Sequence, residues 1–170
     1  MQRSLALGCG MSFLLLYVAC VLGQDAPSSA LRAYRQAAGA VLTTYVQEQR
    51  SWNHYFTRVA PQQKVGDQIP PQNAYRRFLA TTLTQWRQIS VPLPCEGTHA
   101  LYEQALLAYG VAADFHLIFL QASRALFSVR AVREFAAERT QHYTALGDTY
   151  FRQAAQHAQA SGCVPSATPG

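Results

Sequence analysis

Two long stretches without proline dominate the second half of the chain, and their apolar residues recur at helical spacing. Residues 99–122 are almost free of charge, whereas residues 128–159 alternate apolar positions with arginine and glutamate. Gly110 and Gly147 are the only glycines between residues 98 and 160. One helix of that length would extend about 95 Å at 1.5 Å per residue, which is too long for a domain of this size. The pattern therefore predicts two helices folded back on each other.

Cysteines stand just outside these stretches, at Cys95 and Cys163. A disulfide requires their Cα atoms to lie within about 7 Å of each other, so the chain would reverse near their midpoint. Ser128 stands at that midpoint, and serine is a favoured helix N-cap. The sequence thus predicts an antiparallel hairpin that turns at residues 126–128 and is closed at its open end by a Cys95–Cys163 disulfide.

Two further helices are predicted before this hairpin. The first begins after Ser28 and Ser29, which are the expected caps, and runs to residue 58 or 59 before Ala60-Pro61; the second spans residues 72–89. Residues 61–71 are expected to form a loop because they contain three prolines and a glycine. The expected inward positions are Leu31, Tyr34, Ala38, Val41, Tyr45, Trp52, Phe56 and Val59, then Tyr75, Leu79, Thr82, Trp86 and Ile89. Thr98 is the expected N-cap of the third helix. The fold class is therefore all-α, a four-helix up-down bundle.

The third helix is apolar on nearly every side. Its main stripe comprises Leu101, Ala105, Ala108, Ala112, Phe115, Phe119 and Ala122, and further apolar residues, Leu106, Leu107, Leu117, Ile118 and Leu120, lie beside it. A four-helix bundle encloses no helix completely, so an exposed apolar strip is expected here. Such a strip would bind a protein partner or form a homodimer. On the fourth helix the expected inward stripe is Val129, Val132, Ala136, Tyr143, Leu146, Tyr150 and Ala154.

The N-terminus has the pattern of a secretory signal peptide at residues 1–23: one basic residue, an uncharged run and small residues before a polar start. Two alternatives remain, a lipid anchor at Cys20 and an uncleaved membrane anchor. Residues 24–163 would then form the helical domain, and residues 164–170 a flexible tail. Two of the four cysteines lie in the leader, and the remaining pair is typical of an exported protein with a disulfide. The expected location is periplasmic, cell-surface or secreted.

Charge is unevenly distributed along the chain. Residues 31–90 carry eight basic and two acidic side chains, whereas residues 91–170 carry five basic and six acidic ones. The basic half could contact an anionic surface through Arg32, Arg35, Arg50, Arg76 and Arg87, or it could simply be a solvated face. No pattern indicates specific recognition of nucleic acid.

Four polar residues fall on or beside the predicted inward faces: Glu48, Asp114, His116 and Arg139. In an up-down bundle all four would lie about 5–8 Å from the midplane on the same side. They are candidate ligand-binding residues. The alternative is a structural role, such as a Glu48–Arg139 ion pair, because buried charges need partners.

Several kinds of chemistry find no support in the sequence. A di-iron centre needs Glu-x-x-His motifs and carboxylates on four helices, yet residues 72–89 contain no acid. A haem held by His116 would rest on one histidine. The pairs His99/Glu103 and Glu138/His142 are expected to be exposed rather than metal-binding. No cofactor or metal is predicted. The sequence favours a non-enzymatic exported binding module, with a small-ligand or metal-binding bundle as the alternative.

Overall fold

The structure is a computed structural model that describes residues 28–125 and 130–163. Its helices are α2 (Ser29–His54), α3 (Val65–Arg87), α4 (Glu96–Arg124) and α5 (Arg130–Ser161). Short elements join them: a π-helical turn at Tyr55–Val59 and 3-10 turns at Ala60–Gln62 and Leu93–Cys95. The predicted signal peptide, the turn at 126–128 and the tail at 164–170 lie outside the described residues.

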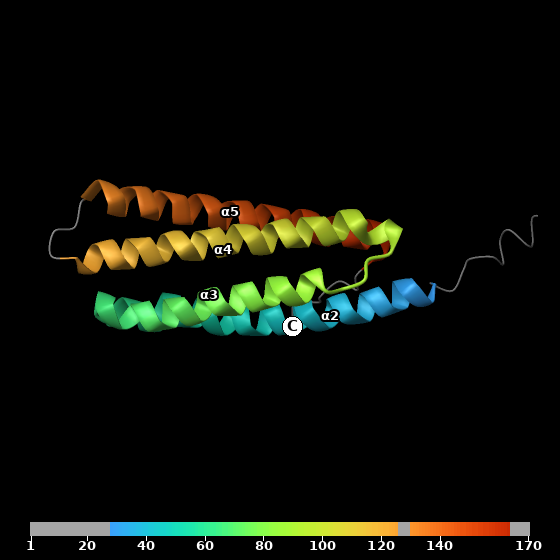
Figure 1. Cartoon of the computed structure of the whole chain (residues 1–170), viewed down its shortest axis with the longest axis horizontal. Coiled ribbons are helices and arrows are strands. Elements are labelled where there is room, and N and C mark those ends of the chain that lie inside the picture. Colours follow the sequence, from blue (N-terminus) through green and yellow to red (C-terminus); the bar gives the residue numbers. More distant parts are fainter. Residues whose placement is uncertain (1–27, 126–129, 164–170) are drawn as a thin grey trace, which may run out of the picture.

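The four helices run alternately up and down, which confirms the predicted all-α bundle (Figure 1). They form two antiparallel hairpins that lie one on the other, α2 with α3 and α4 with α5. The Cys95–Cys163 disulfide joins the open end of the α4–α5 hairpin, with its Cα atoms 5.4 Å apart. The ends of the two helices, at Arg124 and Arg130, bracket the predicted point of reversal.

A C-terminal cap on α5 brings the second cysteine into place. Gly162 has a φ of 63°, a left-handed conformation that glycine adopts without steric cost. The backbone N–H of Cys163 then donates to the carbonyl of Ala158 at 3.1 Å, as in a Schellman cap. At the N-terminus of α2, the Ser28 hydroxyl accepts from the Leu31 N–H at 3.2 Å and caps the helix, as predicted.

Helix α3 begins seven residues earlier than the sequence predicted, so the expected loop at 61–71 is partly wrong. Pro70 and Pro71 lie inside the helix, where each removes one backbone hydrogen bond. These losses fall at the start of α3, close to the first-turn amides that have no intrahelical acceptor anyway. The Gln68 side chain stabilises this start by donating to the carbonyl of Ala60 at 2.9 Å.

The prediction that Thr98 caps the third helix is also wrong. Helix α4 begins at Glu96, and Thr98 is buried within its first turn. Its hydroxyl lies 2.8 Å from Nδ1 of His157 on α5. Thr98 therefore connects the two helices of the hairpin close to the disulfide.

Helix α4 is the central helix because it packs against both α3 and α5. This arrangement narrows the predicted exposed strip: Leu106 and Leu120 are each 2% exposed and Leu117 is 9% exposed, contrary to the prediction. Leu107 is half-buried and Ile118 is 41% exposed, so part of the apolar face of α4 remains open to solvent. Among the described residues, one helical segment, Leu93–Arg124, is long and apolar enough to cross a membrane; the same composition suits a helix packed on two sides.

The α5 stripe is also only partly as predicted. Ala136 and Ala154 are buried, as expected, whereas Val132 is 42% exposed together with the neighbouring Phe135. Helix α5 packs closely on one neighbour, α4, so its buried face is narrower than the apolar pattern suggests.

Aromatic side chains fill the space between α2 and α3. Trp52 and Phe56 each contact Tyr75, with ring centroids 5.4 and 5.3 Å apart, and Tyr45 stacks on Phe78 at 6.0 Å. Aromatic pairs at these separations contribute beyond the area they bury.

Candidate functional site

A cavity of about 580 Å³ lies between the two hairpins. It occupies the half of the bundle nearer to the α4–α5 turn, and every one of the four long helices contributes to its wall. Most of the apolar lining is aromatic or alanine: Tyr45, Val46, Phe56, Tyr75, Tyr109, Ala112, Ala113 and Phe151. Its polar lining is Gln49, Arg50, Asn53, Gln72, His116, Thr140, Thr144 and Asp148.

The seam between α2 and α5 forms the mouth of this cavity. Nearer the disulfide, the seam is bridged by the Arg35 guanidinium, whose Nε donates to the Gly162 carbonyl. It is bridged again where the rings of Tyr45 and Phe151 lie 5.8 Å apart. Beyond that contact, the exposed residues that line the cavity are Arg50 and Asn53 on α2 and Thr144 and Asp148 on α5. The cavity is thus reached from one side of the bundle.

The floor of the cavity is a hydrogen-bonded pair, Gln72 and His116. The fully buried Gln72 donates from Nε2 to the carbonyl of Ala113 at 2.8 Å, and its Oε1 lies 3.0 Å from Nδ1 of His116. A carbonyl only accepts, so this bond fixes the orientation of the Gln72 amide. Oε1 must then accept from His116, which places the imidazole proton on Nδ1.

This tautomer leaves Nε2 of His116 as a hydrogen-bond acceptor. Burial lowers the pKa of His116 below its usual value, so the ring is neutral at pH 7. No described residue donates to Nε2, and the ring lines the cavity between Phe56 and Phe119, at centroid distances of 5.7 and 6.2 Å. His116 therefore offers a ligand one acceptor on an otherwise aromatic surface.

A second polar pair lies at the α5 side of the cavity. The Tyr109 hydroxyl donates to Asp148 at 2.7 Å, and burial together with this bond raises the pKa of Tyr109. The ring packs against Gly147, where a Cβ atom would stand only 2.7 Å from two ring carbons. Glycine at this position therefore permits the ring to form that part of the wall.

We expect Gly147→Ala to destabilise the protein by about 1–3 kcal/mol, because the added methyl group would overlap the Tyr109 ring. The matched control is Gly110→Ala on α4, where a Cβ atom would meet nothing within 4 Å. That change should stabilise the fold by about 0.5–1 kcal/mol, since alanine is the better helix former. Urea unfolding of both variants measures the difference, and shifts of equal sign would contradict the packing of Tyr109.

The four predicted site residues are not brought together. His116 lines the cavity, whereas Glu48 is exposed on α2. Asp114 is exposed and forms an ion pair with Arg76 of α3, and Arg139 lies over the Phe135 ring at 5.2 Å. The ion pairs of the described residues do not include the expected Glu48–Arg139 pair. Glu48 sits at the edge of the α2 stripe, and no neighbouring helix covers that edge.

The residues missed in the sequence are mostly uncharged. Gln72, Tyr109 and Thr144 carry no charge that would mark them on an apolar face. Gln49 is adjacent to the predicted site residue Glu48, and its Oε1 accepts from the Tyr75 hydroxyl at 3.1 Å. The signal that could have located the cavity is a set of uncharged polar residues at inward positions of several helices, all at the same height in the bundle.

The prediction that His99 is exposed is wrong. Its ring stacks on Trp86 at 4.6 Å and is buried, because α3 places that indole over the first turns of α4. Glu103 pairs instead with Arg87, at 2.8 Å. Glu138 and His142 are exposed, as predicted.

The basic half of the sequence corresponds to one layer, the α2–α3 hairpin. Three of the five arginines predicted to contact an anionic surface are engaged within the fold: Arg76 with Asp114, Arg87 with Glu103 and Arg35 with the Gly162 carbonyl. Arg32 is exposed, and Arg50, which also has an interaction partner, lies at the mouth of the cavity.

Comparison with known proteins identifies no relative. No family model matches the chain, and no curated protein or solved structure is significantly similar to it. Within residues 28–125 and 130–163, no group of three or more histidine, cysteine, aspartate or glutamate side chains gathers where a metal ion could bind.

Proposed function

We propose that the protein is a binding protein that holds a small, largely apolar molecule in the cavity between its two hairpins. The observation that carries this proposal is the cavity itself, with its aromatic walls and a few fixed polar groups. Its volume of about 580 Å³ falls within the range of roughly 300–1,000 Å³ that is typical of small-molecule sites. Protein interiors are close-packed and contain few voids larger than a water molecule, so a cavity of this size is unusual.

The distribution of charge supports an apolar body for the ligand. The deep part of the wall combines aromatic rings with the neutral Gln72–His116 pair, whereas Arg50 and Asp148 lie at the exposed rim. Transfer of apolar surface from water to such walls is favourable by about 25 cal/mol per Å². The acceptor at Nε2 of His116 would orient a ligand that carries one donor.

The proposal includes export from the cytosol. The disulfide at Cys95–Cys163 supports it, because such bonds persist in oxidising compartments. The leader pattern at residues 1–23 supports it independently. We infer a carrier or sensor of an apolar compound outside the cytosol, with no catalytic step.

The experiment uses N-phenyl-1-naphthylamine, a neutral aromatic probe that fluoresces in apolar surroundings. Thr144→Trp places an indole at the mouth, from an exposed position whose hydroxyl bonds only its own helix. We expect the probe to bind the unaltered protein, and this variant to weaken binding at least about tenfold, or about 1.4 kcal/mol.

Gln156→Trp is the matched control, since Gln156 is exposed on the same helix and does not line the cavity. It should leave the affinity within about twofold, which is less than 0.5 kcal/mol. Equal affinities in both variants, or no binding by the unaltered protein, would overturn the proposed function.

A further inference from the structure

A second, smaller hollow of about 240 Å³ lies next to the main cavity, toward the α4–α5 turn. Phe119, Arg133 and Ala137 line it, together with Arg130 and Glu134. The two hollows follow one another along the same faces of α4 and α5. Phe119 of the smaller hollow lies one turn beyond His116 of the main cavity on α4, and Ala137 lies one turn before Thr140 on α5. The rings of His116 and Phe119 stack at 6.2 Å and stand between the two hollows.

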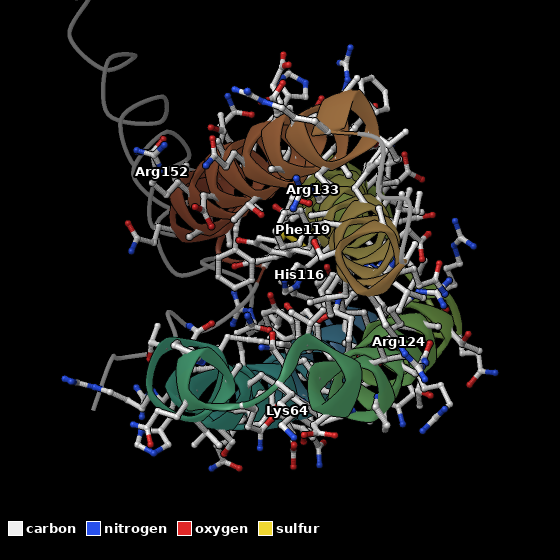
Figure 2. The ribbon with its side chains drawn as sticks, turned by 90° about the vertical axis from the view of Figure 1, so that its left-hand side faces the viewer. Lys64, His116, Phe119, Arg124, Arg133 and Arg152 are labelled. Carbon is white, nitrogen blue, oxygen red and sulfur yellow. A yellow bond between two sulfur atoms is a disulfide. The ribbon has the colours of Figure 1, made fainter. Side chains whose placement is uncertain are left out.

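Arg133 is the unusual residue of this hollow. Its Nε is buried and has no hydrogen-bond partner among the described residues. The neighbouring carboxylate of Glu134 is engaged with Arg130 at 2.6 Å. Figure 2 shows Arg133 and Phe119 where α5 and α4 meet, with His116 nearer to the α2–α3 layer.

A buried donor without an acceptor is unfavourable, and arginine carries its charge throughout the physiological range. The acceptor that best satisfies it is an oxyanion, because the guanidinium fork matches carboxylate, sulfonate and phosphate oxygens and binds them with charge-assisted hydrogen bonds. The acidic residue of the main cavity, Asp148, accepts from Tyr109. It lies 15 residues from Arg133, or about 22 Å along the helix, and cannot serve.

We propose that the ligand is an anionic amphipath, with its acid group at Arg133 and its apolar body in the main cavity. This inference rests on the proposed function and specifies the class of ligand. Thr140 lies seven residues from Arg133, about 10 Å along α5, so a ligand at least that long reaches from the acid group into the aromatic part of the cavity. The His116–Phe119 stack would contact the ligand where head and body join.

Two fluorescent probes with the same ring system separate the parts of this proposal. The first, 8-anilinonaphthalene-1-sulfonate, carries an oxyanion, and N-phenyl-1-naphthylamine lacks it. We expect the protein to bind the sulfonate on the order of tenfold more tightly than the neutral probe. Arg133→Met retains an unbranched apolar stem and should remove this difference, leaving the affinity for the neutral probe within about twofold.

The control is Arg152→Met, which removes the same charge from an exposed position on α5, away from both hollows. Figure 2 shows Arg152 on the outside of the bundle. It should change neither affinity more than about twofold, since exposed charges act weakly at this distance. If Arg133→Met does not fold, as judged by circular dichroism, Arg133→Gln gives the same test, because it removes both the charge and the guanidinium fork but keeps a polar side chain.

The outcomes are distinct. Equal affinities for both probes, or a sulfonate affinity that Arg133→Met and Arg152→Met reduce alike, would overturn the assignment of the acid group to Arg133 and leave the apolar cavity intact. Failure of the neutral probe to bind the unaltered protein would instead overturn the proposed function.

Discussion

Leu106→Asp is expected to unfold the protein. Leu106 lies on α4 with 2% of its side chain exposed, within the buried core between the hairpins. An aspartate there would lose its hydration, and Arg76, which lines the hollow beside Leu106, is already paired with Asp114. The substitution would also leave the space of a leucine unfilled. We expect a loss of more than about 4 kcal/mol, comparable with the whole stability of an ordinary domain. Urea titration followed by circular dichroism measures it.

Ile118→Asp on the same helix is the matched comparison. Its side chain is 41% exposed, so a carboxylate there can remain hydrated. The cost should stay below about 1 kcal/mol, as for most surface changes. A Leu106→Asp variant as stable as Ile118→Asp would show that α4 is not packed between α3 and α5.

These two residues also show where the sequence stops being informative. Both belong to the set of apolar residues beside the main stripe of the third predicted helix, and nothing in their spacing separates them. The distinction arises from which neighbours lie against α4, and Leu106 is buried because α3 and α5 both do. An all-round apolar helix predicts that something covers it, but the pattern does not reveal which face stays uncovered.

The global fold could be predicted because it depends on patterns of long range along the chain. The absence of proline between the two cysteines, combined with disulfide geometry, leaves a hairpin as the only compact arrangement. The start of α3 could not be predicted in the same way. Two prolines usually end a helix, yet here Gln68 bonds to Ala60 and stabilises the short turn that precedes them.

The sequence pointed to the position of His116 but not to that of its hydrogen-bond partner, Gln72. His116 is recognisable as a polar residue beside an apolar stripe, and it does line the cavity. Gln72 lies 44 residues away in the sequence and stands at the predicted edge of a loop, so only the packing of α3 on α4 brings the two together. Tyrosines contribute rings to apolar stripes, which hides hydroxyl groups such as that of Tyr109.

The second large effect is expected from removal of the disulfide by Cys95→Ala with Cys163→Ala. The bond closes a loop of 68 residues, and both sulfur atoms belong to fully buried residues. The loop-closure relation gives about 4 kcal/mol of stabilisation, mainly through restriction of the unfolded chain. Alanine is the substitution of choice because serine would bury two hydroxyl groups. The denaturation midpoint under oxidising conditions measures the loss.

The same variant also tests whether the two ends of the bundle are independent. Cys95 lies 14 residues before Tyr109 on α4, about 21 Å from the nearest part of the cavity on that helix. Because the bond acts chiefly on the unfolded state, the folded fraction should bind N-phenyl-1-naphthylamine with unchanged affinity.

Treatment of the unaltered protein with a reductant is the control, and it should give the same midpoint as the double variant. An unchanged midpoint would contradict the role of the cross-link in stability. A lower probe affinity in protein that is still folded would instead mean that the disulfide holds α4 and α5 in the spacing that keeps the cavity open.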